Sequence, residues 1–314
     1  MDTDRNRKSI SIKTPAKINL GLLVKEKRED GYHNIETILL SISLFDEVLL
    51  SLEGEGIEIS SSSKDIPKDE TNLAYRAADV FLSHLSLKRG VKIHIKKSIP
   101  VGRGLGGGSS DAASVLWGLN RLLHNPLKFE ELLKLGLLIG SDVPFFLYTG
   151  ASYATSRGEV LTPLPLPPFS ILLYIPPYPI STKWAYTNLN NLGLTNAESS
   201  LKIVKEKIER EEWREIGRYL RNSFEDLIFP LHPDLRRMKE RFLELGAISA
   251  GLSGTGSAVY GLIEKGREIR ERGILSLRPV DLGRRLFGRT QDFGSWKGGS
   301  NPPAPVSEGE FESL

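Results

Sequence analysis

A glycine-rich stretch in the first half of the chain reads Pro100-Val101-Gly102-Arg103-Gly104-Leu105-Gly106-Gly107-Gly108-Ser109-Ser110-Asp111. Glycine lets a backbone adopt positive φ and approach a bulky anion closely. The stretch follows alternating apolar residues typical of a strand and precedes an apolar stripe typical of a helix over residues 109–124. The N-terminus of such a helix favours a phosphate. We therefore predict a phosphate-binding loop, with the hydroxyl of Ser109 or Ser110 capping the helix.

Two common phosphate-binding motifs do not account for this stretch. A P-loop needs Lys before its final Ser or Thr, and Gly108 stands there. Gly102, Gly104 and Gly107 fit the dinucleotide pattern G-x-G-x-x-G, but that motif opens a doubly wound sheet. Residues 9–60 instead predict strands of antiparallel hairpins, so we reject both motifs.

The surrounding pattern predicts an α+β fold with two domains. Further expected elements are a helix over residues 73–85, strands over 91–95 and 171–175, helices over 202–221 and 237–245, and two strands within 247–263. Seven prolines between residues 161 and 179 indicate a boundary, which gives domains 9–162 and 163–290. Residues 291–314 lack a folding pattern, and we expect a disordered tail there.

Composition excludes several classes of protein. The chain has 314 residues, 39% of them hydrophobic and 26% charged, which is typical of a globular protein and excludes disorder throughout. The absence of cysteine excludes disulfides and thiolate metal sites. No apolar run approaches the ~18 residues of a membrane span, and residues 1–8 are too charged for a secretory signal. We expect a soluble cytoplasmic protein with a net charge of +3.

The glycine-rich stretch, with its flanking residues 99 and 112–113, resembles the ATP-binding motif of the GHMP kinase superfamily. Residues 14–22 resemble the amino-terminal motif of that superfamily, and residues 250–258 resemble its carboxy-terminal glycine motif. One branch, whose substrate carries a cytosine, is similar in further segments, namely residues 16–20, 30–33, 140–146 and 157–159. The resemblance covers roughly residues 10–265.

This resemblance implies a two-domain GHMP kinase fold, with an N-terminal domain like ribosomal protein S5 domain 2 and a ferredoxin-like C-terminal domain. The implied activity is ATP-dependent phosphorylation of the 2-hydroxyl of a cytidine diphosphate methylerythritol, in the non-mevalonate route to isoprenoid precursors. ATP would bind with Mg²⁺, for which Ser110 is a possible ligand and no dedicated protein site is expected. The implied ATP-binding residues are Pro100, Val101, Gly102, Arg103, Gly104, Leu105, Gly106, Gly107, Gly108, Ser109 and Ser110.

Lys17 and Asp142 match the catalytic pair of the superfamily. Asp142 would take the proton of the attacking hydroxyl, and Lys17 would stabilise negative charge on the transferring phosphoryl group. Without the resemblance, Lys17 reads as a surface lysine. Asp142 also fits a helix N-cap, because Pro144 follows at an early helical position.

Five residues match the substrate-binding positions of the cytosine-recognising branch, namely Asn19, Tyr32, His33, Thr182 and Tyr186. His33 would hydrogen-bond the base, Tyr32 and Tyr186 would stack on its two faces, and Asn19 would contact the methylerythritol end. Tyr186 alone equally fits a core or helix-face position. Arg103 departs from the small residue usual in the superfamily, and it could contact the phosphates or point to solvent.

Two alternative functions are weaker. Another kinase of the superfamily, acting on homoserine or a mevalonate derivative, would not need the Asp-Gly-Tyr-His sequence at residues 30–33, because neither substrate carries a base. A nucleic-acid-binding protein is possible on charge, since residues 265–289 hold eight basic and three acidic side chains. Phe287 is the only aromatic there, so we expect no nucleic-acid partner. No membrane partner is expected either, and the sequence predicts no oligomeric state.

Overall fold

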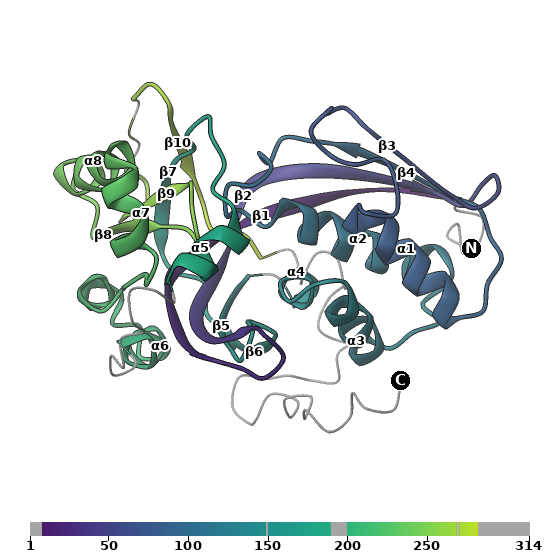
Figure 1. The fold of residues 1–314 in the computed structure, drawn as a ribbon, viewed down its shortest axis with the longest axis horizontal. Helices are drawn as coiled ribbons and strands as arrows, with labels where there is room; N and C mark the ends of the chain where they lie inside the picture. The colour runs from purple at the N-terminus through teal and green to yellow at the C-terminus, as the bar shows by residue number, and fades with distance from the viewer. Residues whose placement is uncertain (1–7, 149, 190–199, 268, 270, 282–314) are drawn as a thin grey trace.

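A computed structural model of the chain describes residues 8–148, 150–189, 200–267, 269 and 271–281. The tail expected over residues 291–314 lies outside these described residues. The fold is α+β, as expected from the sequence. Two sheets organise it, and Figure 1 shows them side by side along the long axis of the molecule. Among the described residues, none of the helices combines the length and the hydropathy that a membrane span requires.

The first sheet has six strands in the order β3-β4-β2-β5-β6, with β1 paired to β2. Its strands are β1 (Ser9–Lys27), β2 (His33–Ser51), β3 (Ile57–Ser61), β4 (Val91–Lys96), β5 (Ala151–Thr155) and β6 (Val160–Leu164). The long β1–β2 hairpin is antiparallel, whereas β3 and β4 are parallel. Along β2, residues 47–51 pair with β4 and residues 37–40 pair with β5. One long strand therefore organises the whole sheet.

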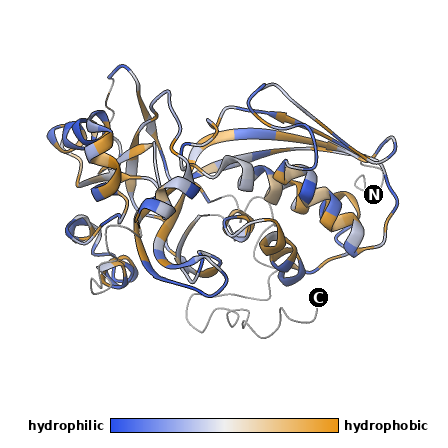
Figure 2. Ribbon diagram, viewed as in Figure 1, coloured by the Kyte–Doolittle hydropathy of each residue, from blue (hydrophilic) through white to orange (hydrophobic). Residues whose placement is uncertain are grey.

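Four helices cover one face of this sheet (Figure 1). They are α1 (Leu73–His84), α2 (Gly107–Leu122), α3 (Phe129–Ile139) and α4 (Val143–Tyr148). Their apolar faces form a core with the sheet, in which Phe81 and Phe145 are completely buried. Figure 2 shows hydrophobic residues on α2, α3 and the strands beneath them, and hydrophilic residues in the β1–β2 connection. Helix α2 is the central helix of this layer because it contacts α1, α3, α4 and both long strands.

The second sheet is antiparallel in the order β10-β7-β9-β8. Its strands are β7 (Phe169–Tyr174), β8 (Ser249–Leu252), β9 (Val259–Glu264) and β10 (Ile274–Leu277). The accompanying helices are α5 (Thr182–Leu189), α6 (Ser200–Glu209), the short 3₁₀ helix η2 (Trp213–Arg218), α7 (Glu225–Leu231) and α8 (Pro233–Glu244). Helix α8 packs closely on β9, since a Cβ at Gly261 would lie 3.0 Å from the Phe242 side chain.

The β1–β2 hairpin also contacts the second half of the chain. Leu22 donates its N–H to the carbonyl of Arg221 at 2.8 Å and accepts the N–H of Ser223 at 2.8 Å. This approach requires glycine next to Leu22, because Gly21 has φ +87° and a Cβ there would lie 2.9 Å from the Arg221 carbonyl. The first strand of the chain is thereby fixed to the C-terminal half.

Three sequence predictions need correction. The helix predicted over residues 202–221 ends at Glu209, and Glu211 turns the chain at φ +60° before η2 begins. Helix α2 begins at Gly107, two residues before the predicted start, because Gly106 at φ +70° closes the preceding loop. The predicted boundary at residue 162 falls inside β6, and the two sheets separate between Leu164 and Phe169. The exact domain boundaries stay a prediction.

Truncating the Phe81 side chain tests the core between the first sheet and its four helices. Phe81→Ala removes a completely buried ring between α1 and the sheet, so it should lower the free energy of unfolding by about 3–5 kcal/mol in urea denaturation. The matched control is Leu138→Ala on α3, whose side chain is 53% exposed and whose loss should cost less than about 0.5 kcal/mol. Equal effects of the two substitutions would contradict this assignment of the core.

Candidate active site

The residues between β4 and α2 form a loop with three left-handed glycines. We call residues 100–106 the glycine loop. Gly102, Gly104 and Gly106 have φ values of +71°, +75° and +70°. Gly104 allows the closest approach, because a Cβ there would lie 2.3 Å from the Ser253 carbonyl oxygen. The loop therefore needs glycine both for its backbone conformation and for its packing.

Helix α2 presents an uncapped N-terminus at the end of the glycine loop. Its N-cap is Gly106, which has no side chain to accept the first N–H groups of the helix. The first N–H groups of any helix lack intrahelical partners, and they carry partial positive charge. Phosphate oxygens fit both properties of this helix end.

The two serines at the start of α2 do not cap it. Ser110 is completely buried, and its hydroxyl donates to the Pro15 carbonyl at 2.6 Å and also contacts Thr14 Oγ1. The predicted serine cap is therefore wrong. Ser110 instead fixes α2 to β1, and its hydroxyl is occupied by protein groups.

Lys17 and Asp142 meet beside the glycine loop. Lys17 lies on β1, and its Nζ is 3.7 Å from Oδ2 of Asp142, the residue that precedes α4. The lysine side chain is 7% exposed and the aspartate side chain is 38% exposed. The lysine backbone N–H donates to the Leu105 carbonyl at 2.9 Å, so main-chain contact fixes the strand to the glycine loop. The pair thus has a buried ammonium and an accessible carboxylate.

Asn19 orients this lysine. Its Oδ1 accepts a hydrogen bond from Lys17 Nζ at 2.7 Å, and its Nδ2 donates to Thr37 Oγ1 at 2.8 Å. Residues two apart on a strand share a face, which brings the Lys17 and Asn19 side chains together. The sequence assigned Asn19 to the substrate, whereas the structure directs both ends of its amide to protein partners. Nothing in the sequence indicated the role of Thr37.

The turn between β8 and β9 closes the site from the C-terminal half. We call residues 253–257 the carboxy-terminal turn. Ser253 Oγ accepts the N–H of Asn19 at 3.2 Å and donates to the Gly104 carbonyl at 3.2 Å. Asn222, which the sequence analysis missed, donates to the carbonyls of Leu252 and Gly254 at 2.7 and 2.9 Å. The three segments that resemble GHMP motifs therefore converge.

His33 and Tyr186 form an aromatic pair from opposite halves of the chain. His33 begins β2 and is buried, and its ring centroid lies 5.4 Å from that of Tyr186 on α5, at an interplanar angle of 31°. Burial, together with the charge of Asp142, raises the pKa of the Tyr186 hydroxyl. Thr182, at the start of α5, contacts Thr255 of the carboxy-terminal turn, with 3.2 Å between the hydroxyl oxygens.

Tyr32 lies apart from this pair. Its side chain is 56% exposed, and the Arg157 guanidinium carbon lies 5.0 Å from its ring centroid. Asp30 accepts the Tyr32 N–H at 3.0 Å and pairs with Arg28 at 3.2 Å, which fixes the turn. The structure brings the rings of His33 and Tyr186 together, whereas the contact of the Tyr32 ring is with Arg157.

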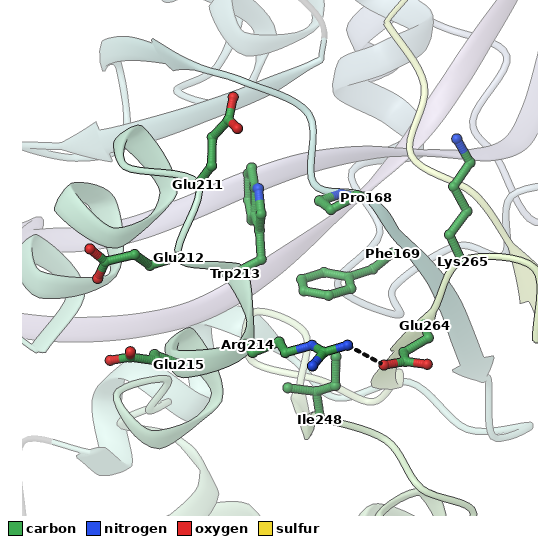
Figure 3. Close-up of a pocket in the computed structure, with 10 residues that line it drawn as sticks. All are labelled: Pro168, Phe169, Glu211, Glu212, Trp213, Arg214, Glu215, Ile248, Glu264 and Lys265. Atoms are coloured by element: carbon green, nitrogen blue, oxygen red, sulfur yellow. Dashed lines mark hydrogen bonds and ion pairs between the residues drawn. The ribbon is translucent and has the colours of Figure 1, made fainter.

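A cavity of about 570 Å³ lies away from these residues, in the part of the chain that forms the second sheet (Figure 3). Trp213 and Phe169 pack edge to face in it with centroids 6.0 Å apart, and Arg214 pairs with Glu264 at 3.3 Å across it. None of the sequence-predicted site residues lines this cavity. The Lys17–Asp142 pair and the cavity are therefore separate features.

Three comparisons place these features among known proteins. Residues 72–150 match the GHMP kinases N terminal domain, and residues 204–273 match the GHMP kinases C terminal domain. A 4-diphosphocytidyl-2-C-methyl-D-erythritol kinase of Shouchella clausii (strain KSM-K16) is 43% identical over 81% of this chain and 86% of its own length.

Solved structures agree with this likeness. A crystal structure of a 4-(cytidine 5'-diphospho)-2C-methyl-D-erythritol kinase superposes with a TM-score of 0.69 and 36% identity, covering 82% of this chain and 91% of its own. A homoserine kinase from Cytophaga hutchinsonii superposes with a TM-score of 0.67 at 22% identity over 85% of this chain and 88% of its own. The second likeness concerns the fold alone. The two-domain GHMP kinase fold expected from the sequence is confirmed.

A buried cluster of three charged side chains lies beneath the glycine loop. Lys97 Nζ contacts Oδ2 of Asp46 at 2.5 Å and Oδ2 of Asp111 at 2.9 Å, and each of these side chains is at most 6% exposed. A Cβ at Gly107 would lie 2.8 Å from Lys97 Nζ, which places the ammonium directly under the start of α2. Burial raises the pKa of the Asp111 carboxyl to about 7, against the partial compensation by Lys97.

This shift predicts a pH-dependent stability. An unfolded Asp ionises near pH ~4, so the folded state binds the extra proton above that pH. The stabilisation is complete below pH ~4 and is lost as pH rises through about 7. In urea unfolding, the free energy of the parent protein minus that of Asp111→Asn should fall between pH 5 and pH 8. The exposed control Asp79→Asn should show no such change. A constant difference for Asp111→Asn would refute the raised pKa.

Proposed function

The chain belongs to the 4-diphosphocytidyl-2-C-methyl-D-erythritol kinases of the GHMP family, and on that premise we propose that it phosphorylates the 2-hydroxyl of 4-diphosphocytidyl-2-C-methyl-D-erythritol. It is a small-molecule kinase that uses ATP. The proposed step supplies isoprenoid precursors by the non-mevalonate route. One observation carries the proposal for this chain's own residues, namely the Lys17–Asp142 pair, 3.7 Å apart, beside the uncapped N-terminus of α2.

Asp142 acts as the general base in this proposal. Its carboxylate is 38% exposed and accepts no hydrogen bond from the described part of the chain, so it can accept the proton of the substrate hydroxyl. The N-cap reading of Asp142 receives no support, because no N–H of α4 bonds its side chain. Asn19 holds Lys17 so that its ammonium lies beside Asp142, where it stabilises negative charge on the transferring phosphoryl group.

The glycine loop and the start of α2 hold the triphosphate. The fit rests on the N–H groups of α2 that no side chain caps. When bound, ATP supplies the phosphoryl group and Mg²⁺ neutralises charge on its oxygens. The described residues contain no cluster of three or more His, Asp or Glu that could hold a metal. Mg²⁺ in kinases is bound by the substrate phosphates together with one or two carboxylates, so such a cluster is not required.

The His33–Tyr186 pair is the proposed recognition site for cytosine. The two rings contact each other, and the charge of Asp142 contributes, after burial, to the raised pKa of the Tyr186 hydroxyl. An aromatic ring that stacks on a base contributes about 1–3 kcal/mol. In this proposal Tyr32, whose side chain is 56% exposed, stacks on the second face of the base. A cytoplasmic location stays a prediction.

The sharpest test of the proposal is substrate choice. Purified protein with ATP and Mg²⁺ should release ADP with the cytidylated methylerythritol and show no release above background with homoserine or mevalonate. The reason is that His33 and Tyr186 select a base that the other two alcohols lack. Turnover of homoserine or mevalonate alone would retain the kinase fold and refute the cytosine site.

Asp142→Asn tests the assignment of the base. The amide is isosteric and cannot take a proton, so kcat should fall by about 10²–10⁴-fold. Calorimetry should find that binding of a non-hydrolysable ATP analogue stays within about threefold, because the glycine loop is untouched. Asp226→Asn, on α7, serves as the matched control. A near-normal kcat for Asp142→Asn would mean that another group takes the proton.

A further inference from the structure

Arg103 lies in the glycine loop. The sequence left open whether its side chain contacts phosphate or points to solvent. In the structure its guanidinium is bonded to backbone carbonyls. Its Nε donates to the Pro176 carbonyl at 3.1 Å, and its Nη2 donates to the Pro177 carbonyl at 2.8 Å. Its Nη1 donates back to the Val101 carbonyl of the same loop at 3.0 Å. Three of the five guanidinium N–H groups are therefore engaged by backbone carbonyls.

We call residues 176–180, which follow β7, the proline segment. Proline has no N–H, so the carbonyl is the only backbone group with which Pro176 and Pro177 can hydrogen-bond. Arg103 supplies the donors for these carbonyls from the other half of the molecule. The glycine loop and the proline segment also approach each other closely at a second point. A Cβ at Gly102 would lie 3.1 Å from Pro179 Cβ.

The proline segment is itself fixed to the carboxy-terminal turn and to α8. Ser257 Oγ donates to the Tyr178 carbonyl at 2.6 Å, and the Tyr178 hydroxyl donates to Asp234 at 2.5 Å. Ile180 is buried in the same core as Ala185 of α5. The segment thus behaves as one rigid connection between the glycine loop and α5.

Helix α5 begins two residues after this segment and carries Tyr186, which contacts His33. We propose that Arg103 is a positioning residue that fixes the glycine loop to the proline segment, and through that segment fixes α5. Arg103 then acts on ATP and on the base indirectly, by holding their two binding elements in register. The link to the base rests on the proposed function, whereas the link to the glycine loop does not.

Binding measurements on Arg103→Ala, Arg103→Gln and Arg103→Lys test this role. The probes are a non-hydrolysable ATP analogue with Mg²⁺ and, separately, CDP, both titrated by calorimetry. Loss of two cross-segment hydrogen bonds in Arg103→Ala should weaken binding of the analogue about 5–10-fold and of CDP about threefold. Arg103→Gln retains amide donors for the carbonyls and should recover part of both losses. Arg103→Lys should recover no more than Arg103→Gln does.

A matched control is Arg76→Ala. It removes a hydrogen bond of 3.3 Å from the Arg76 guanidinium to the carbonyl of Leu138, which is 62 residues away in the sequence. It should leave both affinities unchanged. In turnover, Arg103→Ala should raise KM for ATP while kcat stays within about threefold, because Lys17 and Asp142 are not displaced.

Three results would overturn the proposal. Unchanged binding of the ATP analogue by Arg103→Ala would exclude positioning of the glycine loop. Full recovery by Arg103→Lys with none by Arg103→Gln would mean that the positive charge contacts phosphate. Unchanged CDP binding would refute the link to α5. Failure of the proposed function would give a different result. The parent protein would then release no ADP with the cytidylated alcohol, while Arg103→Ala would still bind the ATP analogue more weakly than the parent does.

Discussion

The close approach of the glycine loop to the carboxy-terminal turn is the constraint on which the site depends. At Gly104 a side chain of even one carbon would lie 2.3 Å from the Ser253 carbonyl oxygen. The Ser253 hydroxyl then bonds both the glycine loop and Asn19, which holds Lys17. Main-chain proximity therefore sets Lys17, the N-terminus of α2 and the C-terminal half in one arrangement. Glycine at φ +75° is the residue that permits it.

The sequence was sufficient to predict the α+β fold and the glycine loop because both depend on local patterns. Alternating apolar residues mark β4, and an apolar stripe marks α2. The same patterns did not reveal which way the loop side chains point. Ser110 and Arg103 both looked suited to phosphate, yet their partners lie 95 and 73 residues away in the sequence. Long-range contacts of this kind leave no local signature.

Charge patterns were the least informative feature of the sequence. The amphipathic pattern of α6 continues past the point where Glu211 turns the chain, so the pattern alone did not predict the end of the helix.

The buried Asp46–Lys97–Asp111 cluster was also missed. Its residues belong to β2, to the segment after β4 and to α2, which meet only in the folded chain. Tyr32 and His33 are adjacent in sequence, but successive residues near a strand start point to opposite sides, and only His33 is buried.

The bond between Asn19 and Ser253 joins residues 234 positions apart. During synthesis on a ribosome, at roughly 5–20 residues per second, β1 emerges on the order of ten seconds or more before the turn that fixes it. The partners of the Lys17 side chain, Asn19 and Asp142, are made much earlier. The hydroxyl of Ser253 therefore joins a group of residues that the ribosome has already released, and it is the last part of this network to be synthesised.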